Sequence, residues 1–158
     1  MFAMNGSAPE SVMELESFFP YRLAVLSEAV SRSMAQVYAE RFDLSRDEWR
    51  VLSALAGGAG TRTALVIERT TLDKVSVSRA LARLQAKSLV ERSTDPDDGR
   101  GYLISLLPAG RALFRKIVPM VQAREQFLLE GLEAGERSAL ESAMEKLLQR
   151  ARQLHQQG

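Results

Sequence analysis

The sequence contains no cysteine and only one histidine, His155, close to its C-terminal end. Without thiols the chain has no disulfide framework, no thiolate nucleophile and no thiolate metal site. A single imidazole cannot supply the cluster of ligands that a zinc ion requires, and we expect His155 to lie in a solvent-exposed tail. The sequence therefore predicts no metal site and no bound cofactor.

Long apolar runs are missing as well. Charged residues interrupt every apolar stretch well short of the roughly 18 residues that a membrane span requires. Residues 1–12 contain Gly6 and Pro9 but no basic segment followed by an apolar run. This pattern predicts a flexible N-terminal tail rather than a signal peptide. We therefore expect a soluble, cytoplasmic protein that makes no membrane contact.

The groups that most enzymes use are also absent. The sequence offers no paired carboxylates on neighbouring elements, and the glycine-rich segment 57–60 lacks the lysine and the Ser/Thr of a nucleotide-binding loop. We expect no catalytic residues. The formal net charge is only +1, so any binding of nucleic acid must depend on local rather than overall charge.

Periodicity predicts the elements of the first half. Apolar residues spaced three or four apart predict one long helix from Leu15 to Arg41, with Pro20 either kinking it or starting its main part. Ser45 and Glu48 form a capping-box signature at the start of a second helix. The glycines of segment 57–60 then predict a turn.

The second half contains helix, hairpin and helix signals. Helices are expected at 63–69 and 73–87, and the short link between them is typical of a helix-turn-helix. The β-prone runs 89–92 and 102–106 flank a polar segment and predict a hairpin with a long tip. A helix follows from 108 to 130, with a kink expected at Pro119, and residues 131–135 interrupt it before a last helix. The sequence predicts a mainly α fold with a small β-wing, a winged helix-turn-helix.

The helix predicted at 73–87 has one apolar face and one cationic face. At 100° per residue, Val77, Leu81 and Leu84 share one side. The cationic face, about a third of a turn away, comprises Ser76, Arg79, Arg83 and Lys87. Such a face is typical either of a solvated surface or of a helix that binds DNA.

Position along this helix suggests which side chains would read bases. The first turns of a recognition helix point at base edges in the major groove. The side chains there are Lys74, Ser76, Ser78 and Arg79. Arg83, Lys87 and Arg92 are expected to contact phosphates instead, which adds affinity without sequence information.

The hairpin tip carries Arg100 between Gly99 and Gly101. An arginine held out on a loop beside a recognition helix is placed to enter the adjacent minor groove, where narrow A·T-rich segments concentrate negative potential. The alternative is an ordinary solvent-exposed turn residue. The order of helix, turn, basic helix and hairpin favours the DNA contact.

These motifs resemble the MarR family of transcription regulators. The matching segments are residues 44–52, 72–79 with Leu84, 89–92, the wing signature 95–100, and 106–110. Leu107 stands where the family usually has threonine, and Ser88 where glycine is common. The resemblance implies that Arg100 is the minor-groove residue and that Asp98 orients the wing through a carboxylate-to-arginine pairing.

The terminal helices carry more apolar side chains than a winged helix of about 70 residues could cover. A two-fold homodimer would bury them and set two recognition helices about 34 to 36 Å apart on a palindromic site. The alternative is an intramolecular bundle in a monomer. We interpret residues 13–43 as an N-terminal helix contributing to dimerisation, 44–107 as the DNA-binding region and 108–155 as C-terminal dimerisation helices.

The resemblance also implies a repressor that is released from DNA by a small aromatic or phenolic effector. Tyr38, Trp49 and Phe114 are expected to line an apolar cleft, or else to be ordinary core residues. Arg22 or Arg50 would meet the acid group of such a ligand. Segments 19–23 and 48–50 are most similar to the branch of the family that regulates aromatic-acid catabolism, including regulators that sense hydroxycinnamoyl thioesters.

A protein-interaction module that has lost DNA binding is the remaining rival to a regulator. Such a module predicts neutral or apolar residues in place of the basic ones. Arg79, Arg83 and Arg100 are all present, which favours the DNA-binding interpretation.

Overall fold

The computed structural model describes residues 13–58 and 60–157, so the tail expected at residues 1–12 lies outside the described residues. A short 3₁₀ turn, η1 (Leu15–Ser17), precedes the first helix. The α-helices are α1 (Phe19–Phe42), α2 (Arg46–Leu55), α3 (Thr63–Thr70), α4 (Lys74–Ala86), α5 (Pro108–Leu129) and α6 (Ala134–Gln157). The strands are β1 (Thr61–Arg62), β2 (Val90–Thr94) and β3 (Tyr102–Leu106).

Helix α1 begins where proline allows it to begin. Phe18 has an extended backbone, and Pro20 lies in the first turn, where its missing N–H is no loss. Of the two alternatives for Pro20, the structure therefore shows the second, in which it starts the main part of the helix. The helix ends at Asp43, whose φ of 51° is left-handed.

The capping box predicted for α2 is confirmed. The Glu48 backbone N–H donates to Ser45 Oγ at 3.1 Å, and the Ser45 N–H donates to Glu48 Oε2 at 2.7 Å. These two bonds satisfy backbone donors that the first turn of a helix otherwise leaves without partners.

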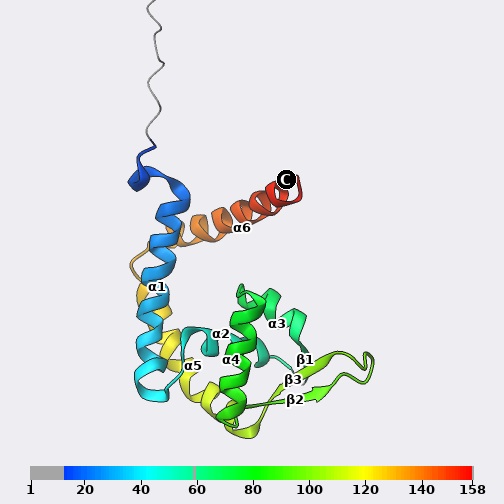
Figure 1. Cartoon of the computed structure of the whole chain (residues 1–158). Coiled ribbons are helices and arrows are strands. Elements are labelled where there is room, and N and C mark those ends of the chain that lie inside the picture. Colours follow the sequence, from blue (N-terminus) through cyan, green and yellow to red (C-terminus); the bar gives the residue numbers. More distant parts are fainter. Residues whose placement is uncertain (1–12, 59, 158) are drawn as a thin grey trace, which may run out of the picture.

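The winged helix consists of α2, α3, α4 and a three-stranded antiparallel sheet in the order β1-β3-β2. Strands β2 and β3 form the predicted hairpin, with Val90 opposite Leu106 and Thr94 opposite Tyr102. Figure 1 shows this hairpin extending away from the helices. The structure thus confirms a mainly helical fold with a small β-wing.

Strand β1 was not predicted from the sequence. It has two residues, Thr61 and Arg62, which pair with Ile104 and Leu103 of β3. A strand of two residues is too short to produce an alternating pattern. Its position matters because it places Arg62 at the base of the wing.

The terminal helices differ in how much they contact the rest of the protomer. Figure 1 shows α1 and α5 side by side, while α6 extends away from them. The Arg124 guanidinium on α5 donates to the Ser33 carbonyl and to the Gln36 side chain on α1, which ties these two helices together. No residue of α6 is buried.

Two details of the C-terminal helices correct or extend the prediction. The interruption expected at 131–135 covers residues 130–133 instead, and Gly135 lies inside α6. Glu136 accounts for this earlier start, because its Oε2 accepts the Glu133 N–H at 2.9 Å and caps the helix. Helix α5 continues through Pro119 as far as Leu129.

The core of the winged helix is apolar and continuous with the α1–α5 pair. The side chains buried in it include Leu44, Leu52, Val66, Val77, Leu81, Leu84, Ile104 and Ile117. The predicted apolar face of α4 is therefore the face that packs. Burial of one Leu or Ile side chain stabilises a fold by about 1.5 to 3 kcal/mol, so this cluster holds α4 against α2.

The structure shows the backbone surroundings of three family-motif positions. Ser88 adopts a φ of 57°, a conformation that favours glycine, which is the common residue there. Leu107 caps α5 without a side-chain hydrogen bond, and its own backbone N–H donates to the Leu89 carbonyl at 2.9 Å. Gly110 is buried directly against that same carbonyl.

We predict that Gly110→Ala destabilises the protein. A Cβ at this position would collide with the Leu89 backbone oxygen, and backbone cannot move aside as a flexible side chain can. Overpacking of this kind costs about 1–3 kcal/mol. Urea unfolding should show a lower midpoint for this variant.

Gly135→Ala is the matched control. A Cβ at Gly135 meets nothing within 4 Å, and alanine is favoured over glycine in a helix by about 0.5–1 kcal/mol. We expect the control to be neutral or stabilised. Equal effects of the two substitutions would contradict the close approach at Gly110.

Candidate nucleic-acid interface

The helix-turn-helix is closed by a tight turn and a side-chain cap. Thr71 ends α3 in a left-handed conformation with a φ of 58°. Asp73 then caps α4: its Oδ1 accepts the Ser76 N–H at 2.7 Å and its Oδ2 accepts the Ser76 hydroxyl at 3.1 Å. These bonds from Ser76 hold the pKa of Asp73 below its usual value. The cap therefore remains a charged carboxylate at neutral pH.

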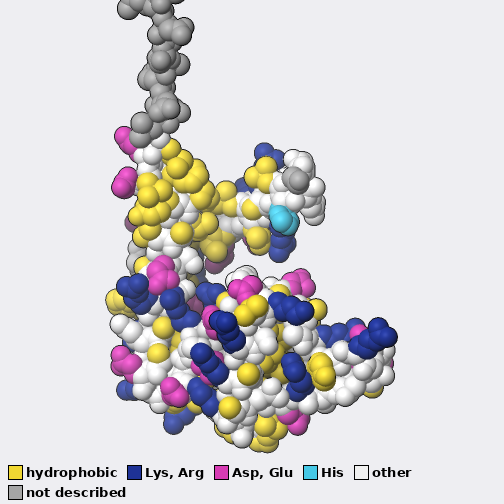
Figure 2. Space-filling model, in the orientation of Figure 1, with side chains coloured by type: hydrophobic (Ala, Val, Ile, Leu, Met, Phe, Trp, Pro, Cys, Tyr) yellow, Lys and Arg dark blue, Asp and Glu magenta, His cyan; other side chains and the backbone are white. Residues whose placement is uncertain are grey.

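The predicted base-reading side chains lie at the exposed start of α4. Lys74, Ser78 and Arg79 are exposed, and so is Arg83 further along the helix. Ser76 differs, because it is half-buried and its hydroxyl already donates to Asp73. Figure 2 shows Lys and Arg side chains gathered on one face of the winged helix and at the end of the wing. A polyanion could approach this face without displacing any core residue.

Two of the predicted phosphate contacts have partners within the protein. Lys87 Nζ lies 2.9 Å from Glu48 Oε1 and 3.5 Å from Asp43 Oδ2, and the Lys87 side chain is only 31% exposed. Its ammonium group is thus paired with carboxylates inside the protein, which makes a phosphate contact by Lys87 less favourable than one by Arg83. Arg92 stacks on the Tyr102 ring, with Cζ 4.5 Å from the ring centroid.

The wing tip is a structured loop rather than a loose one. The Asp95 N–H donates to the Gly101 carbonyl at 3.0 Å, and the Gly101 N–H donates to the Asp98 carbonyl at 2.8 Å. The Arg100 N–H donates to Asp98 Oδ1 at 3.1 Å, while the Arg100 side chain is exposed. This loop therefore presents the Arg100 guanidinium on a defined backbone.

The carboxylate-to-arginine pairing of the wing involves a different aspartate from the one predicted. Asp95 is 2% exposed, and its Oδ2 accepts from Arg62 Nε at 2.6 Å. Asp98 instead accepts a backbone N–H, so it shapes the tip locally. The pairing predicted for Asp98 is thus corrected to Asp95, which joins the wing to β1.

Hydrogen bonding keeps Asp95 ionised. The Asp97 N–H, followed by the Arg62 guanidinium, holds the pKa of Asp95 below its usual value. A carboxyl with a lowered folded-state pKa stabilises the fold above its unfolded-state pKa of about 3.9. This stabilisation is lost as the pH falls through the folded-state pKa.

We predict that Asp95→Asn lowers stability at neutral pH and that the difference from wild type shrinks below pH of about 4. The amide removes the charge that pairs with Arg62 but keeps an oxygen that can accept the Asp97 N–H. Thermal unfolding at a series of pH values measures the effect. Asp97→Asn is the control, because Asp97 is exposed and lies 3.7 Å from the Arg62 guanidinium. A deficit for Asp95→Asn that does not vary with pH would contradict the ionic anchor.

The three aromatic residues predicted to line a cleft lie together. Trp49 stacks on Tyr38 with ring centroids 5.3 Å apart and on Phe114 with centroids 5.6 Å apart. They come from α2, α1 and α5, respectively. Tyr38 is 3% exposed, and burial raises the pKa of its hydroxyl, which therefore stays neutral.

A hollow of about 460 Å³ opens beside this stack. Trp49, Arg50 and Arg69 line it, together with Ser53, Ala54, Thr70 and Thr71. Arg69 was not predicted, since its place beside Trp49 depends on how α3 packs on α2. Arg22 lies 16 residues before Tyr38 on α1, about 24 Å along the helix. Within one protomer the structure therefore brings Arg50, but not Arg22, to the aromatic residues.

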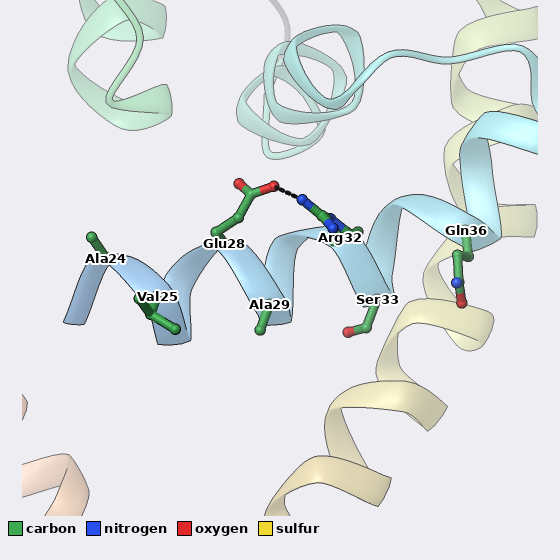
Figure 3. A pocket seen from close by; sticks show the side chains of 7 residues that line it. All are labelled: Ala24, Val25, Glu28, Ala29, Arg32, Ser33 and Gln36. Carbon is green, nitrogen blue, oxygen red and sulfur yellow. Dashed lines mark hydrogen bonds and ion pairs between the residues drawn. The ribbon is translucent and has the colours of Figure 1, made fainter. Parts of the chain in front are cut away.

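A second hollow, of about 630 Å³, runs along α1. It is lined by Ala24, Val25, Glu28, Ala29, Arg32, Ser33 and Gln36. Figure 3 shows Glu28 and Arg32 paired on one side of the helix, with Val25, Ala29 and Ser33 directed to the other. Small side chains make this surface a groove into which a helix could pack.

The described residues contain neither a metal-binding cluster nor a membrane-spanning helix. No group of three or more His, Asp or Glu side chains there could hold a metal ion. None of the described helices combines the length and the apolar character needed to cross a membrane.

Comparison with known proteins agrees with this geometry. Residues 42–101 match the model of the MarR family. The HTH-type transcriptional repressor NicR of Pseudomonas putida is 29% identical over 105 residues, which are 66% of each chain and so just under two thirds of NicR. The structure of Bordetella bronchiseptica BpsR, whose DNA binding is regulated by 6-hydroxynicotinic acid, has a TM-score of 0.77 and 27% identity, covering 85% of this chain and 96% of BpsR.

The relative that settles the family is the multiple antibiotic resistance protein MarR of Escherichia coli strain K12. It is 30% identical over 112 residues, which cover 70% of this chain and 78% of that protein. Taken with the capped recognition helix and the three-stranded wing, this similarity shows that the chain belongs to the MarR family of winged helix-turn-helix, DNA-binding transcription regulators.

Proposed function

We propose that this protein is a repressor that binds palindromic double-stranded DNA as a homodimer in the cytoplasm and is released by a small aromatic or phenolic acid. The observation that carries the proposal is the joint exposure of the α4 cations and the Arg100 side chain on a wing anchored by Asp95. In this proposal the start of α4 reads the major groove. Arg100 reads the adjacent minor groove.

The individual roles follow from position and from what each side chain already contacts. Lys74, Ser78 and Arg79 project from the first turns of α4 and would meet base edges. Ser76 would contribute only if its hydroxyl shared its bond to Asp73, so we rank it below the others. Arg83 would contact phosphate, which positions the helix without reading sequence.

The rivals to this proposal fit the described residues less well. A winged helix that only binds proteins has no use for exposed arginines on both the recognition helix and the wing. An enzyme needs titratable groups gathered in a cleft, whereas the ionised Asp73 and Asp95 are committed to a helix cap and to Arg62.

Homodimer formation is supported by apolar surface that the protomer leaves uncovered. Exposed large apolar side chains lie on α1, at the end of α5 and along α6: Phe19 52%, Leu23 53%, Leu26 58%, Phe127 77%, Met144 61%, Leu147 48% and Leu148 53%. Figure 2 shows such side chains gathered at this end of the molecule. A monomer that buried these faces in its own bundle would not leave α6 without a single buried residue.

A second copy is the occupant that fits these faces. They are continuous with the α1 groove, and a partner's helices would cover both groove and apolar side chains in one two-fold interface. Sedimentation at micromolar concentration should give twice the protomer mass of 17.5 kDa. A protomer-sized species under these conditions would contradict the proposal.

The effector proposal depends on the stack of Tyr38, Trp49 and Phe114 and on the adjacent hollow. An aromatic acid could place its ring against Trp49 and its carboxylate between Arg50 and Arg69. Binding that favours a half-site spacing unsuited to DNA would shift the dimer away from the operator. The similarity to BpsR supports this class of ligand, as does the resemblance to regulators of aromatic-acid catabolism.

We predict that an aromatic acid which releases the protein from DNA also quenches its intrinsic fluorescence. Trp49 is the only tryptophan in the chain and lines the hollow, so tryptophan fluorescence reports on the surroundings of this one residue. The measurement is a titration with 6-hydroxynicotinate and with hydroxycinnamate, beside Arg50→Gln and Arg69→Gln. The variants should need more acid for the same quenching. Release from DNA with unchanged Trp49 fluorescence would place the effector elsewhere.

The experiment that tests the proposed function is selection of bound fragments from the source genome. A repressor of this kind should retain fragments that share a palindromic sequence. The Arg79→Ala variant, tested in parallel, should lose this enrichment. Equal recovery of all fragments by the wild-type protein would contradict sequence-specific binding.

A further inference from the structure

An ionic cluster around the buried carboxylate of Glu48 joins three elements behind the recognition helix. The Glu48 side chain is 3% exposed, and its Oε1 lies 2.9 Å from Lys87 Nζ. Its other oxygen accepts the Ser45 N–H of the capping box at 2.7 Å. Lys87 Nζ also donates to the Asp43 carbonyl and lies 3.5 Å from the Asp43 carboxylate. We call Asp43, Glu48 and Lys87 the hinge cluster.

The hinge cluster lies at the point that sets the orientation of α4 relative to α1 and α2. Asp43 ends α1, Glu48 is in the first turn of α2, and Lys87 is the C-cap residue of α4. The cluster therefore ties the C-terminal end of the recognition helix to the junction of α1 and α2. The Lys87 ammonium also satisfies the Asp43 carbonyl at the C-terminal end of α1, where a positive charge is favourable.

A small change in the tilt of α4 at Lys87 produces a large displacement at the opposite end of the helix, which is the end proposed to contact DNA. The 13 residues of α4 span about 20 Å. A tilt of about 10° about the Lys87 end would displace the Lys74 end by about 3 Å, the length of a hydrogen bond. The apolar face holds α4 in place against α2, but apolar contacts are not directional. The ion pair adds a fixed point.

We propose that Glu48 and Lys87 are positioning residues for DNA recognition, which set the angle of α4 through their ion pair and do not touch DNA. The inference rests on the proposed DNA-binding function. The assignment also gives Glu48 a role beyond the capping box, for which one of its two oxygens suffices.

The charge of Glu48 makes the test decisive. Glu48→Gln removes a negative charge close to the DNA-binding helix, so simple electrostatics predicts tighter binding. Positioning predicts weaker binding to the selected operator, by about tenfold, the effect of removing one base-reading hydrogen-bond pair. Glutamine can still cap α2. Glu91→Gln, at an exposed acid on β2, is the charge-matched control and should not weaken binding.

The Lys87→Gln variant separates positioning from a phosphate contact. Removing a cation that neutralises a phosphate lowers the slope of log affinity against log salt by about 0.9 per phosphate. Positioning predicts an unchanged slope, a roughly tenfold weaker affinity for the operator and an unchanged affinity for random duplex. Lys87→Arg should restore most of the operator affinity, because it restores the pairing charge.

The outcomes are distinct. Operator binding by Glu48→Gln that equals or exceeds wild type, or a reduced salt slope for Lys87→Gln, would overturn the inference. If Glu48→Gln fails to fold, Lys87→Gln still tests the inference, because Lys87 is partly exposed. Its salt slope and its affinity for the operator relative to random duplex are then the two measurements. If the wild-type protein binds no DNA, the proposed function itself fails. Failure of the positioning inference alone leaves DNA binding by the wild-type protein intact, so the two results can be distinguished.

Discussion

Replacing Arg100 with alanine should weaken operator binding by about tenfold or more, the effect expected when an arginine that reads a groove is removed. The side chain lies exposed at the tip of the wing, so its removal leaves no cavity and no unpaired partner. The bond that shapes the tip there uses the Arg100 backbone N–H, which alanine keeps. Fluorescence anisotropy with the selected operator measures the change in affinity.

The control for Arg100→Ala is Lys146→Ala. Lys146 is also exposed, but it lies on α6, which Figure 1 shows apart from the wing. The Lys146→Ala substitution removes the same charge as Arg100→Ala but leaves the wing unchanged, so we expect little change in operator affinity. Both variants should unfold at the wild-type temperature. Unchanged affinity for Arg100→Ala in an intact dimer would show that the wing tip does not reach DNA.

Raising the salt concentration should lower the DNA affinity of the wild-type protein by even more than the Arg100→Ala substitution does. A dimer that neutralises about 6 to 10 phosphates releases their counterions on binding, and its affinity should fall by about a thousandfold or more between 50 and 200 mM salt. With a formal net charge of only +1 per chain, this dependence must come from the local cations of α4 and the wing. Titrations at a series of salt concentrations give the slope.

Single substitutions show which residues contribute to the slope of log affinity against log salt concentration. Arg83→Ala should lower it by about 0.9 for each phosphate that is no longer neutralised, whereas Lys87→Gln should leave it unchanged. This difference follows from the ion pair between Lys87 and Glu48, since Arg83 is exposed on the outer face of α4. A flat response of the wild type to salt would contradict the basic face as the site of binding.

Most elements of the fold follow from local signals in the sequence. Ser45 with Glu48, and Asp73 ahead of the basic helix, mark helix starts because a side chain there replaces a missing backbone partner. Strand β1 could not be predicted, since Thr61 and Arg62 form a strand only because β3 lies beside them. Gly135 looked like a break, but the Glu136 cap allows the helix to include it.

The candidate site was less predictable, because its details depend on contacts distant in sequence. A helical wheel places Lys87 with Arg79 and Arg83, yet α4 ends at Ala86 and the Lys87 side chain turns to Glu48. The wing contains Asp95, Asp97 and Asp98, and nothing in their order identifies the one that pairs with an arginine. Strand β1 decides it by bringing Arg62 to Asp95.

Tyr38, Trp49 and Phe114 were expected to line an apolar cleft or else to be core residues, and the structure brings the three rings together. Their mutual stacking, and the position of Arg69 beside Trp49, depend on the packing of α2 against α1, α3 and α5. Helical periodicity indicates which face of a helix packs, but it carries no information about which helix it meets.

Hydroxyl-radical footprinting of the wild-type protein on its selected operator tests the central claim most directly. Two copies of α4 held by one dimer should protect two regions whose centres lie about 34 to 36 Å apart, one turn of the duplex, with wing protection in the flanking minor grooves. The Arg100→Ala footprint should lack only the minor-groove part. A single protected region, or protection with no fixed spacing, would contradict a dimer that reads two half-sites.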